Sequence, residues 1–342
     1  MTIRIGFFGA GFITGVHAFW LRESGIDHDI VAVHDPDPAR AARFAERHGA
    51  REASEEALLD LVDAVYVVPW TSEHPRLVEI AAARGKAIFC EKPLATNAEL
   101  AERMVALVRE AGVANQVGLV LRSLPSFRFL RQLTRDERAG RTMTVVFRDD
   151  QYLPTQGQYA SDWRGDAARA GRGALLEHSI HDLDILRWMF GDVRSVSGVV
   201  REFHGLPRID DLAVARLDFD SDAVATLTSV WHDQLERPSQ RRVEVFSERL
   251  HAVLEGDFEG PVRWQFTGED EQVLDGPGLR AAVADDGLDA NPATVFLRAV
   301  RDGTAATPDF AEALPAHRLA DAVYASSDAG GATISDPEAG PA

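Results

Sequence analysis

The 342-residue sequence has a single cysteine, Cys90, so it cannot form an internal disulfide. It has no apolar run of membrane-spanning length. Its N-terminus has no basic segment followed by an apolar stretch and a small-residue cleavage site, so we expect no signal peptide and a cytoplasmic location. Acidic residues outnumber basic residues by 54 to 36, which gives a net charge of −18. Because nucleic acids and anionic membranes bind basic surfaces, neither is an expected partner.

The first third of the chain alternates short apolar runs with helical segments. The expected strands are residues 3–8, 30–34, 64–68, 87–90 and 116–121, and the expected helices are residues 13–24, 39–48, 75–84 and 97–111. Strands that alternate with helices of this length predict βαβ units and a parallel sheet. Because the crossovers are right-handed, the carboxyl ends of the strands meet at one edge of the sheet, where ligands bind.

The stretch GAGFITGVH, residues 9–17, follows the first expected strand. Gly9 permits a tight turn, and Gly11 allows the backbone to approach a pyrophosphate at the start of the next helix, where Phe12 and Ile13 follow. The third glycine of a G-x-G-x-x-G pattern is replaced by Thr14, which is small enough for close packing. The pattern in this strand–helix context predicts a dinucleotide site.

A carboxylate, Asp35, ends the second expected strand, 24 residues after Gly11. In such sites a carboxylate at this position accepts hydrogen bonds from the adenosine ribose hydroxyls; the alternative is a turn or helix-capping residue. Pro36 and Asp37 follow, so a 2′-phosphate would meet negative charge. The sequence therefore favours NAD over NADP as the cofactor.

The second part of the chain changes rhythm. Strand-like runs follow one another at residues 142–149, 212–219, 223–231, 242–246 and 262–266, which predicts an antiparallel sheet. Helices are expected at residues 173–190, 291–301 and 315–327. The predicted fold is thus α/β: a Rossmann parallel-sheet domain at 1–121, then an α+β domain at 122–332 with an open-faced, mostly antiparallel sheet. Residues 333–342 are expected to be a mobile tail.

Polar residues recur along the expected helix at residues 173–190. Glu177, His181 and Asp184 have the i, i+4, i+7 spacing of one column, beside an apolar stripe. Polar groups on a half-buried helix are costly without partners. They could form an internally paired or solvated face, hold a metal ion, or act as an acid/base pair in which the carboxylate orients the imidazole. We expect no metal site, because no other histidine or cysteine cluster has ligand spacing.

An unusual Glu91-Lys92-Pro93 turn ends the fourth apolar strand, where charged residues and a proline do not suit a ladder. Together with GAGFITGVH and the Gly-Ala-Leu-Leu-Glu-x3-His-x2-Asp segment, it makes the chain resemble the Gfo/Idh/MocA family, over nearly the whole length from Ile3 to Ala332. Most members of this family are NAD(P)-dependent oxidoreductases that act on sugars, polyols or related compounds. The family also contains non-catalytic NAD-dependent sensors and NAD-dependent glycosidases.

The resemblance implies roles for individual residues. The family's lysine in this turn faces the nicotinamide and the substrate hydroxyl, which implies that role for Lys92. Glu91 corresponds to a residue near the nicotinamide ribose, and a cis peptide is common at the turn. His181 is implied as the acid/base group, although Lys92 and His181 could exchange roles. Glu177 stands where the family usually has Asp, so its carboxylate must sit differently.

Further residues are candidates for binding rather than chemistry. At the end of the third strand, the cofactor candidates are Pro69, Trp70 and His74. The substrate candidates are Arg122, Trp163, Arg164, Arg172 and His178. Arg172 replaces a common glycine and either binds an anionic group or points to solvent.

The expected activity is hydride transfer between NAD and a carbinol carbon of a sugar, polyol, inositol or glycoside; the alternatives are the sensor and the glycosidase. Retention of both Lys92 and His181 favours chemistry over sensing. An open sheet with helices on one face leaves the other face exposed, so we expect a homodimer or homotetramer formed through that sheet.

Overall fold

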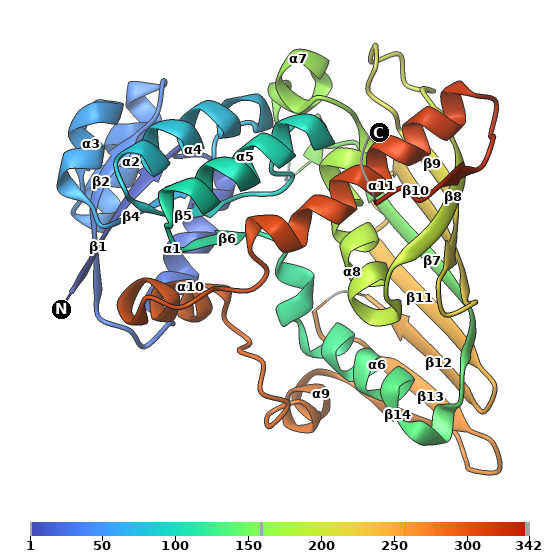
Figure 1. The fold of residues 1–342 in the computed structure, drawn as a ribbon. Coiled ribbons are helices and arrows are strands. Elements are labelled where there is room, and N and C mark those ends of the chain that lie inside the picture. Colours follow the sequence, from blue (N-terminus) through green and yellow to red (C-terminus); the bar gives the residue numbers. More distant parts are fainter. Residues whose placement is uncertain (1, 158–159, 257, 339–342) are drawn as a thin grey trace. The chain divides into compact units, whose positions relative to one another are not determined.

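The computed structural model of the chain describes residues 2–157, 160–256 and 258–338. These residues form two compact units (Figure 1). Unit 1 contains residues up to Leu119 together with Ala168–Gly171 and Asn291–Leu314, and unit 2 contains Val120–Ala167, Arg172–Ala290 and the chain from Pro315 onward. Each unit is described by itself below.

Unit 1 is built on a parallel six-stranded sheet. Its strands are β1 (Ile3–Phe8), β2 (His28–His34), β3 (Arg51–Glu52), β4 (Ala64–Val67), β5 (Ala87–Cys90) and β6 (Asn115–Val117). They lie in the order β3-β2-β1-β4-β5-β6 and all their pairings are parallel. Every residue of β4 and β5 is buried, as expected for strands covered on both faces. The order reverses between β1 and β4, and ligands bind at such switch points.

Helices cover the two faces of this sheet. They are α1 (Phe12–Arg22), α2 (Pro38–His48), α3 (Glu55–Leu61), α4 (His74–Ala83), α5 (Ala98–Ala111) and α10 (Pro292–Asp302). One buried cluster joins Ile5 and Phe7 of β1 to Leu21 of α1, Phe44 of α2 and Phe296 of α10. The opposite face of β1 meets α3, where a Cβ added to Gly6 would lie 2.7 Å from a methyl carbon of Leu58. Unit 1 is therefore a doubly wound Rossmann domain.

Unit 2 is built on a nine-stranded sheet. Its strands are β7 (Thr142–Tyr152), β8 (Val193–Arg201), β9 (Leu212–Phe219), β10 (Val224–His232), β11 (Gln240–Ser247), β12 (Leu250–Glu255), β13 (Val262–Phe266), β14 (Gln272–Leu274) and β15 (Ile334–Ser335). Their order is β14-β13-β12-β11-β7-β10-β9-β8-β15. The pairing of β10 with β7 is parallel, and the others are antiparallel. The sheet is thus mixed but mostly antiparallel, as predicted.

The helices of unit 2 lie on one face of its sheet (Figure 1). They include α6 (Pro125–Arg135), a π-helical turn η6 (Ala174–His178), α8 (Ile180–Phe190), α9 (Gly276–Ala282) and most of α11 (Phe310–Asp328). Burial alternates along β9, as it should when one sheet face packs against helices and the other does not. Leu217 of β9, Leu227 of β10 and Val243 of β11 have buried side chains on the face that the helices cover.

Several elements were not predicted. The short helix α3, the helix α6 and the strands β8 and β12 lie in stretches that the sequence pattern left unassigned. The helical segment expected over residues 173–190 is confirmed, but it is not one regular helix. Its first part, η6, is a π turn in which the Ser179 N–H donates to Ala174 O at 2.9 Å, and α8 begins at Ile180. The expected fifth strand is shorter, since residues 120–123 form a 3₁₀ turn, η2 (Val120–Ser123).

The division of the chain also differs from the expected ranges. Residues 291–314, expected in the second domain, pack with unit 1, because the buried Phe296 and Leu297 of α10 complete the cluster around β1. Within the expected tail, Ile334 and Ser335 pair with β8, and Glu338 accepts a hydrogen bond from Arg187 at 2.7 Å. Ile334, Ser335 and Glu338 therefore contact unit 2, while residues 339–342 lie outside the described part of the chain.

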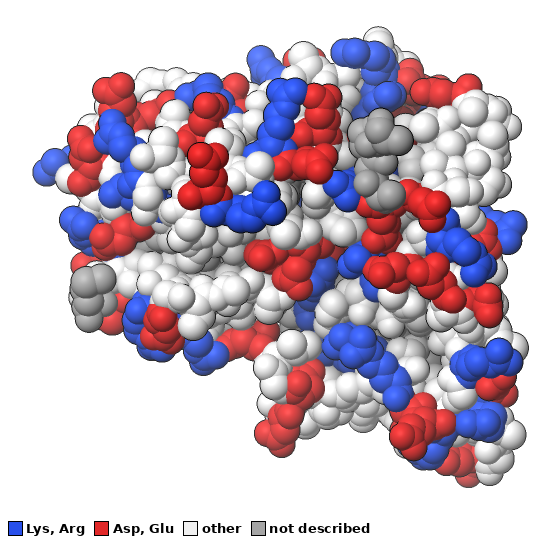
Figure 2. All heavy atoms as spheres, in the orientation of Figure 1, with Lys and Arg blue, Asp and Glu red and all other residues white. Residues whose placement is uncertain are grey.

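Charged residues are mixed on the surface. On the face that Figure 2 shows, acidic and basic side chains lie interspersed among uncharged ones. Within the described residues, none of the helices combines the length and the apolar character that crossing a membrane requires.

Candidate active site

The glycine-rich turn between β1 and α1 has the form that a dinucleotide requires. Gly9 has φ of +103°, and a Cβ there would lie 3.0 Å from the backbone of Val68, so only glycine suits the position. A Cβ on Gly11 would meet nothing within 4 Å, which leaves open space above the helix start. No side chain caps α1, and its first turn has no acidic residue. The turn therefore fits the diphosphate of a dinucleotide.

Thr14 explains the departure from the glycine pattern. Its side chain is fully buried, and its hydroxyl donates to the carbonyl of Gly9 at 3.2 Å. Thr14 thus stabilises the turn through this hydrogen bond. A glycine at the same position would allow close packing but could not form the bond.

Asp35 is tied to the same turn. Its Oδ2 accepts a hydrogen bond from the Ala10 N–H at 2.7 Å, and its Oδ1 accepts one from the Asp37 N–H at 2.8 Å. A carboxylate oxygen has two lone pairs, so each oxygen can accept a second bond from a ribose hydroxyl. Asp37 caps α2 by accepting from Ala39 N at 2.9 Å. The turn-residue and cofactor interpretations of Asp35 are therefore compatible.

The Glu91-Lys92-Pro93 turn is held from below by a buried pair. His17 Nε2 lies 2.7 Å from Glu91 Oε1, and Glu91 Oε2 accepts the Lys92 N–H at 2.9 Å. Burial acts to raise the pKa of Glu91, but the bond to His17 and the charges of His17 and Lys92 hold that pKa below its ordinary value. A Cβ on Gly118 would lie 2.8 Å from Glu91 Oε1, so glycine makes room for the carboxylate. Glu91 is thus an ionised support of the turn.

His74 fixes the same turn from the side. Its Nδ1 lies 2.9 Å from Pro93 O, and its Nε2 lies 3.3 Å from Pro69 O. The ring is buried, and this burial lowers the pKa of His74, so it is neutral at pH 7 and places its proton on the nitrogen with the shorter contact. The Lys92–Pro93 peptide is cis, and Lys92 is half-buried on the turn.

A short segment from elsewhere in the chain reaches this edge of unit 1. Residues 168–171 pack with unit 1, and a Cβ on Gly171 would lie 2.7 Å from Thr96 Cβ. The guanidinium of Arg169 lies 5.2 Å from the centre of the Trp70 ring. Trp70 therefore has a cationic neighbour that the sequence pattern did not indicate.

In unit 2, the segment before α8 is fixed by a buried carboxylate. Asp210 accepts the N–H groups of Gly173 at 2.8 Å and Leu175 at 3.0 Å, and the Tyr324 hydroxyl at 3.0 Å. A Cβ on Gly173 would lie 1.9 Å from Asp210 O, so only glycine fits there. Arg172 lies over the Tyr324 ring at 4.7 Å. Asp210 thus anchors the π turn that carries Glu177.

The three expected column residues do not share one regular helix, but two of them have arginine partners. Arg164 Nε donates to Glu177 Oε1 at 2.8 Å, and the Arg164 guanidinium lies 4.7 Å from the Trp163 ring. Arg122 binds Asp184 through two bonds, of 2.8 and 2.5 Å. The buried carboxylates of Glu177 and Asp184 are thus each paired with an arginine, of which Arg122 is buried and Arg164 is partly exposed. His181, which is 8% exposed, lies between them in the sequence.

A further buried cluster joins α8 to the sheet. Arg241 of β11 lies 2.9 Å from Asp149 of β7 and 2.8 Å from Asp182 of α8. His178 Nε2 lies 3.0 Å from Asp149 Oδ2. Burial, and then the charge of Asp149, raises the pKa of Asp182 to about 7 in spite of Arg241. Two carboxylates thus share one guanidinium beneath the segment that carries His181.

The structure groups the predicted residues as follows. In unit 1, the turns that follow β1, β2 and β5 at the carboxyl edge of the sheet carry or contact Gly9, Gly11, Asp35, Glu91 and His74. In unit 2, Arg122, Trp163, Arg164 and His178 support the segment from Glu177 to Asp184. Sequence reasoning missed Asp149, Asp182, Asp210 and Arg241; the only available signal was the pair Asp149-Asp150 inside a strand pattern.

Comparisons with known proteins agree with this arrangement. Residues 3–119 match an oxidoreductase family with an NAD-binding Rossmann fold, and residues 127–252 match the GFO/IDH/MocA C-terminal domain. The chain is 27% identical over 341 residues to an inositol 2-dehydrogenase of Rhizobium meliloti (strain 1021), covering 95% of this chain and 97% of that one. It is 32% identical over 232 residues to the scyllo-inositol 2-dehydrogenase (NAD(+)) of Bacillus subtilis (strain 168), covering 65% of each.

Solved structures share the fold. A levoglucosan dehydrogenase in complex with NADH and levoglucosan superposes with a TM-score of 0.87 at 19% identity, covering 99% of this chain and 100% of that one. The WlbA dehydrogenase of Bordetella pertussis, in complex with NADH and UDP-GlcNAcA, has a TM-score of 0.85 at 23% identity and covers 98% and 97%.

Proposed function

Because the chain belongs to the GFO/IDH/MocA oxidoreductase family, we propose that it transfers a hydride between NAD and a carbinol carbon of a sugar, polyol, inositol or glycoside. Lys92 and His181 are the residues that we propose to contact the hydroxyl group on that carbon. The observation that carries the proposal is the Lys92 turn. A half-buried lysine stands at the carboxyl edge of an NAD-binding sheet, on a turn held by His17 through Glu91 and by His74. Such bracing keeps a polar group in a fixed position.

Unit 1 supplies the cofactor site. Gly9 and Gly11 leave room for the diphosphate at the start of α1, and the adenosine ribose would meet Asp35. Pro69 and Trp70 follow the end of β4, beside the switch point, where the nicotinamide half would lie. NAD, when bound, supplies the carbon that accepts or returns the hydride.

The protein's own part is to move one proton. A carbinol carbon gives up hydride only as its hydroxyl proton leaves, so a base must reach that oxygen. We assign this role to His181 of unit 2, whose segment is anchored by Asp210, Arg122 and the Arg241 cluster. Lys92 of unit 1 donates a hydrogen bond to the same oxygen and stabilises its developing negative charge.

Glu177 has a different task from that of an acid/base group. Its carboxylate accepts a hydrogen bond from Arg164, which fixes its direction. A carboxylate held in this way accepts hydrogen bonds, so we assign it to a neighbouring substrate hydroxyl. Arg164, backed by Trp163, is then its positioning residue.

The activity is tested by incubating the protein with NAD and a panel of inositols, sugars, linear polyols and glycosides, while NADH absorbance is followed. NADH formation with at least one cyclic polyol or sugar is expected. Cleavage of a glycoside without net NADH would establish the glycosidase instead. NAD binding without turnover of any compound would support the sensor.

We also assign the uncovered face of the unit 2 sheet to homo-oligomer formation. Val146 of β7, Val214 of β9 and Phe246 of β11 are 45%, 43% and 37% exposed, on the face away from the helices. Their neighbours in the pairing, such as Thr226, Thr228 and Glu244, are polar. This face is therefore mixed in character, as subunit interfaces often are.

Light scattering tests the assembly. The wild-type protein should have the mass of a dimer or tetramer at micromolar concentration, and Val146→Asp with Val214→Asp should shift it toward the monomer. An exposed charge away from this sheet, introduced by Phe19→Asp on α1 of unit 1, should leave the mass unchanged. A wild-type monomer contradicts this assignment.

A further inference from the structure

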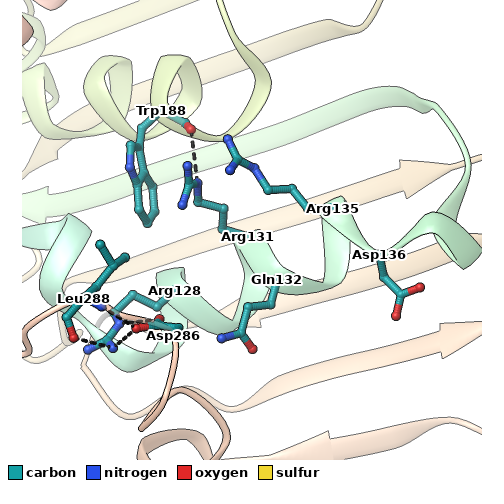
Figure 3. A pocket seen from close by; sticks show the side chains of 8 residues that line it. All are labelled: Arg128, Arg131, Gln132, Arg135, Asp136, Trp188, Asp286 and Leu288. Atoms are coloured by element: carbon teal, nitrogen blue, oxygen red, sulfur yellow. Dashed lines mark hydrogen bonds and ion pairs between the residues drawn. The ribbon is translucent and has the colours of Figure 1, made fainter.

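A hollow lined by arginines lies in unit 2, beside α6 and the end of α8 (Figure 3). It has a volume of about 360 Å³, within the range of small-molecule sites. Its lining residues are Arg128, Arg131, Gln132, Arg135, Asp136, Trp188, Asp286 and Leu288. None of them belongs to the groups assigned above to cofactor or substrate.

One of the three arginines is already neutralised. Arg128 is buried, and its guanidinium binds both oxygens of Asp286 and the carbonyls of Val283 and Leu288. It holds the loop that closes one side of the hollow. Likewise, Asp136 at the far end accepts from Arg138 at 2.8 Å. Both carboxylates of the hollow are therefore engaged with other arginines.

The other two arginines leave positive charge in the hollow. Arg131 and Arg135 extend from successive turns of α6 toward the end of α8 (Figure 3). Arg131 lies 4.1 Å from the centre of the Trp188 ring and donates to Trp188 O at 3.3 Å. Within the described residues, neither Arg131 nor Arg135 forms an ion pair with a carboxylate. Burial, and then the charges of Arg135 and Arg122, lower the pKa of Arg131.

The negative end of the helix dipole does not balance the charges of Arg131 and Arg135. The C-terminus of a helix has the equivalent of about half a negative charge, whereas Arg131 and Arg135 have two full positive charges. Like charges at i and i+4 destabilise a helix. The protein has a net charge of −18, yet among its described residues the two carboxylates of the hollow, Asp136 and Asp286, form their ion pairs with Arg138 and Arg128 and not with Arg131 or Arg135.

We propose that the hollow between α6 and the end of α8 binds a phosphate group, either free or borne by a small metabolite. Two guanidinium forks on one side match the tetrahedral oxygens of a phosphate, and arginine prefers such bidentate contacts. Trp188 holds Arg131 in place through its ring and carbonyl. The volume of the hollow exceeds that of phosphate alone, which leaves room for a small attached group.

Binding is tested with NAD-saturated protein, so that the dinucleotide site of unit 1 is filled. Inorganic phosphate is titrated by calorimetry against sodium chloride at constant ionic strength, and the melting temperature is followed in parallel. Saturable binding with a rise in melting temperature is expected, since a ligand that binds only the folded state stabilises it. Glucose 6-phosphate and glucose form two further arms: tighter binding of the ester than of inorganic phosphate identifies a metabolite-borne phosphate, and glucose alone should not bind.

Variants assign the site. Arg135→Ala and Arg131→Ala should each weaken phosphate binding roughly tenfold or more, as expected for losing hydrogen bonds to a charged group. Arg135→Lys should retain part of the affinity, and Arg135→Glu should abolish binding. Because Arg135 is exposed, its variants should fold, which circular dichroism checks. Arg103→Ala, which removes the same charge from α5, should behave as the wild type. Absence of phosphate-specific binding in the wild type, or equal binding by Arg135→Glu, overturns the proposal.

Discussion

The two units hold the polar groups of their candidate residues in different ways. At the edge of unit 1, side chains bind the backbone of neighbouring loops, as Asp35 does with Ala10 N and His74 with Pro93 O. Under α8 in unit 2, charges meet charges from distant strands and turns, as Arg241 does with Asp149 and Asp182. The first arrangement shapes a surface for a cofactor. The second ties α8, which carries His181, to the strands of the sheet.

The comparison predicts that unit 2 is sensitive to the loss of a single buried charge. Arg241→Ala would leave Asp149 and Asp182 buried without their guanidinium, so the free energy of unfolding should fall by about 3–5 kcal/mol. The matched control is Arg141→Ala, which breaks an exposed pair with Glu248 and should cost about 1 kcal/mol or less. Urea unfolding followed by tryptophan fluorescence measures both. Equal losses for the two variants would show that the buried Arg241 cluster contributes no more to stability than an exposed ion pair.

In unit 1 the corresponding change should affect cofactor binding. Asp35→Ala removes the acceptor that orders the Ala10 turn and the predicted ribose contact, so NAD affinity should fall by roughly tenfold or more. Asp37→Ala removes only the cap of α2 and should lower stability by about 1 kcal/mol with little change in affinity. Calorimetry with NAD and NADP measures this effect. The wild type should prefer NAD, and equal or tighter binding of NADP would contradict the role given to Asp35.

A third predicted effect is a pH dependence that comes from one buried carboxyl of unit 2. The pKa of Asp182 is raised to about 7 by burial and by Asp149, against about 3.9 in the unfolded chain. The folded state therefore holds this proton more tightly, and the resulting stability is full below about pH 4 and is lost as the pH rises through 7. The slope is at most about 1.4 kcal/mol per pH unit.

Asp182→Asn isolates this group, because asparagine resembles the protonated acid but cannot ionise. The difference in unfolding free energy between wild type and variant should shift in favour of the variant between pH 5 and pH 8. Urea titrations at four pH values measure it. A difference that is constant with pH would show that Asp182 does not titrate in this range.

The same contrast explains what the sequence could predict. The turn at Gly9 and Gly11, the carboxylate at Asp35 and the Lys92 turn follow strands directly, so their position in the sequence fixes their position at the sheet edge. The Rossmann domain and the mostly antiparallel second sheet were predicted for the same reason, because hydrophobic periodicity is local.

The polar cluster of unit 2 could not be predicted in this way. Arg241 and Asp182 are 59 residues apart, and Arg122 and Asp184 are 62 apart, so only the packed sheet brings them together. The π turn over Ala174–His178 depends on Asp210, a residue outside any periodic pattern. Because Glu177 lies in this π turn and His181 and Asp184 lie in α8, the three residues do not have the regular helical spacing that the sequence predicted. Likewise, residues 291–314 join unit 1 through the buried Phe296, which no sequence boundary marks.

The central claim is that unit 1 binds the cofactor while Lys92 and His181 together handle one proton. The most direct test measures turnover and NAD affinity for Lys92→Ala and His181→Ala on a substrate found with the panel. The control is Lys86→Ala, which alters the only other lysine in the sequence. Turnover should fall by roughly 10²–10⁴-fold in each of the first two variants, with NAD affinity nearly unchanged, and the control should resemble the wild type. Near-normal turnover in both Lys92→Ala and His181→Ala would contradict the account.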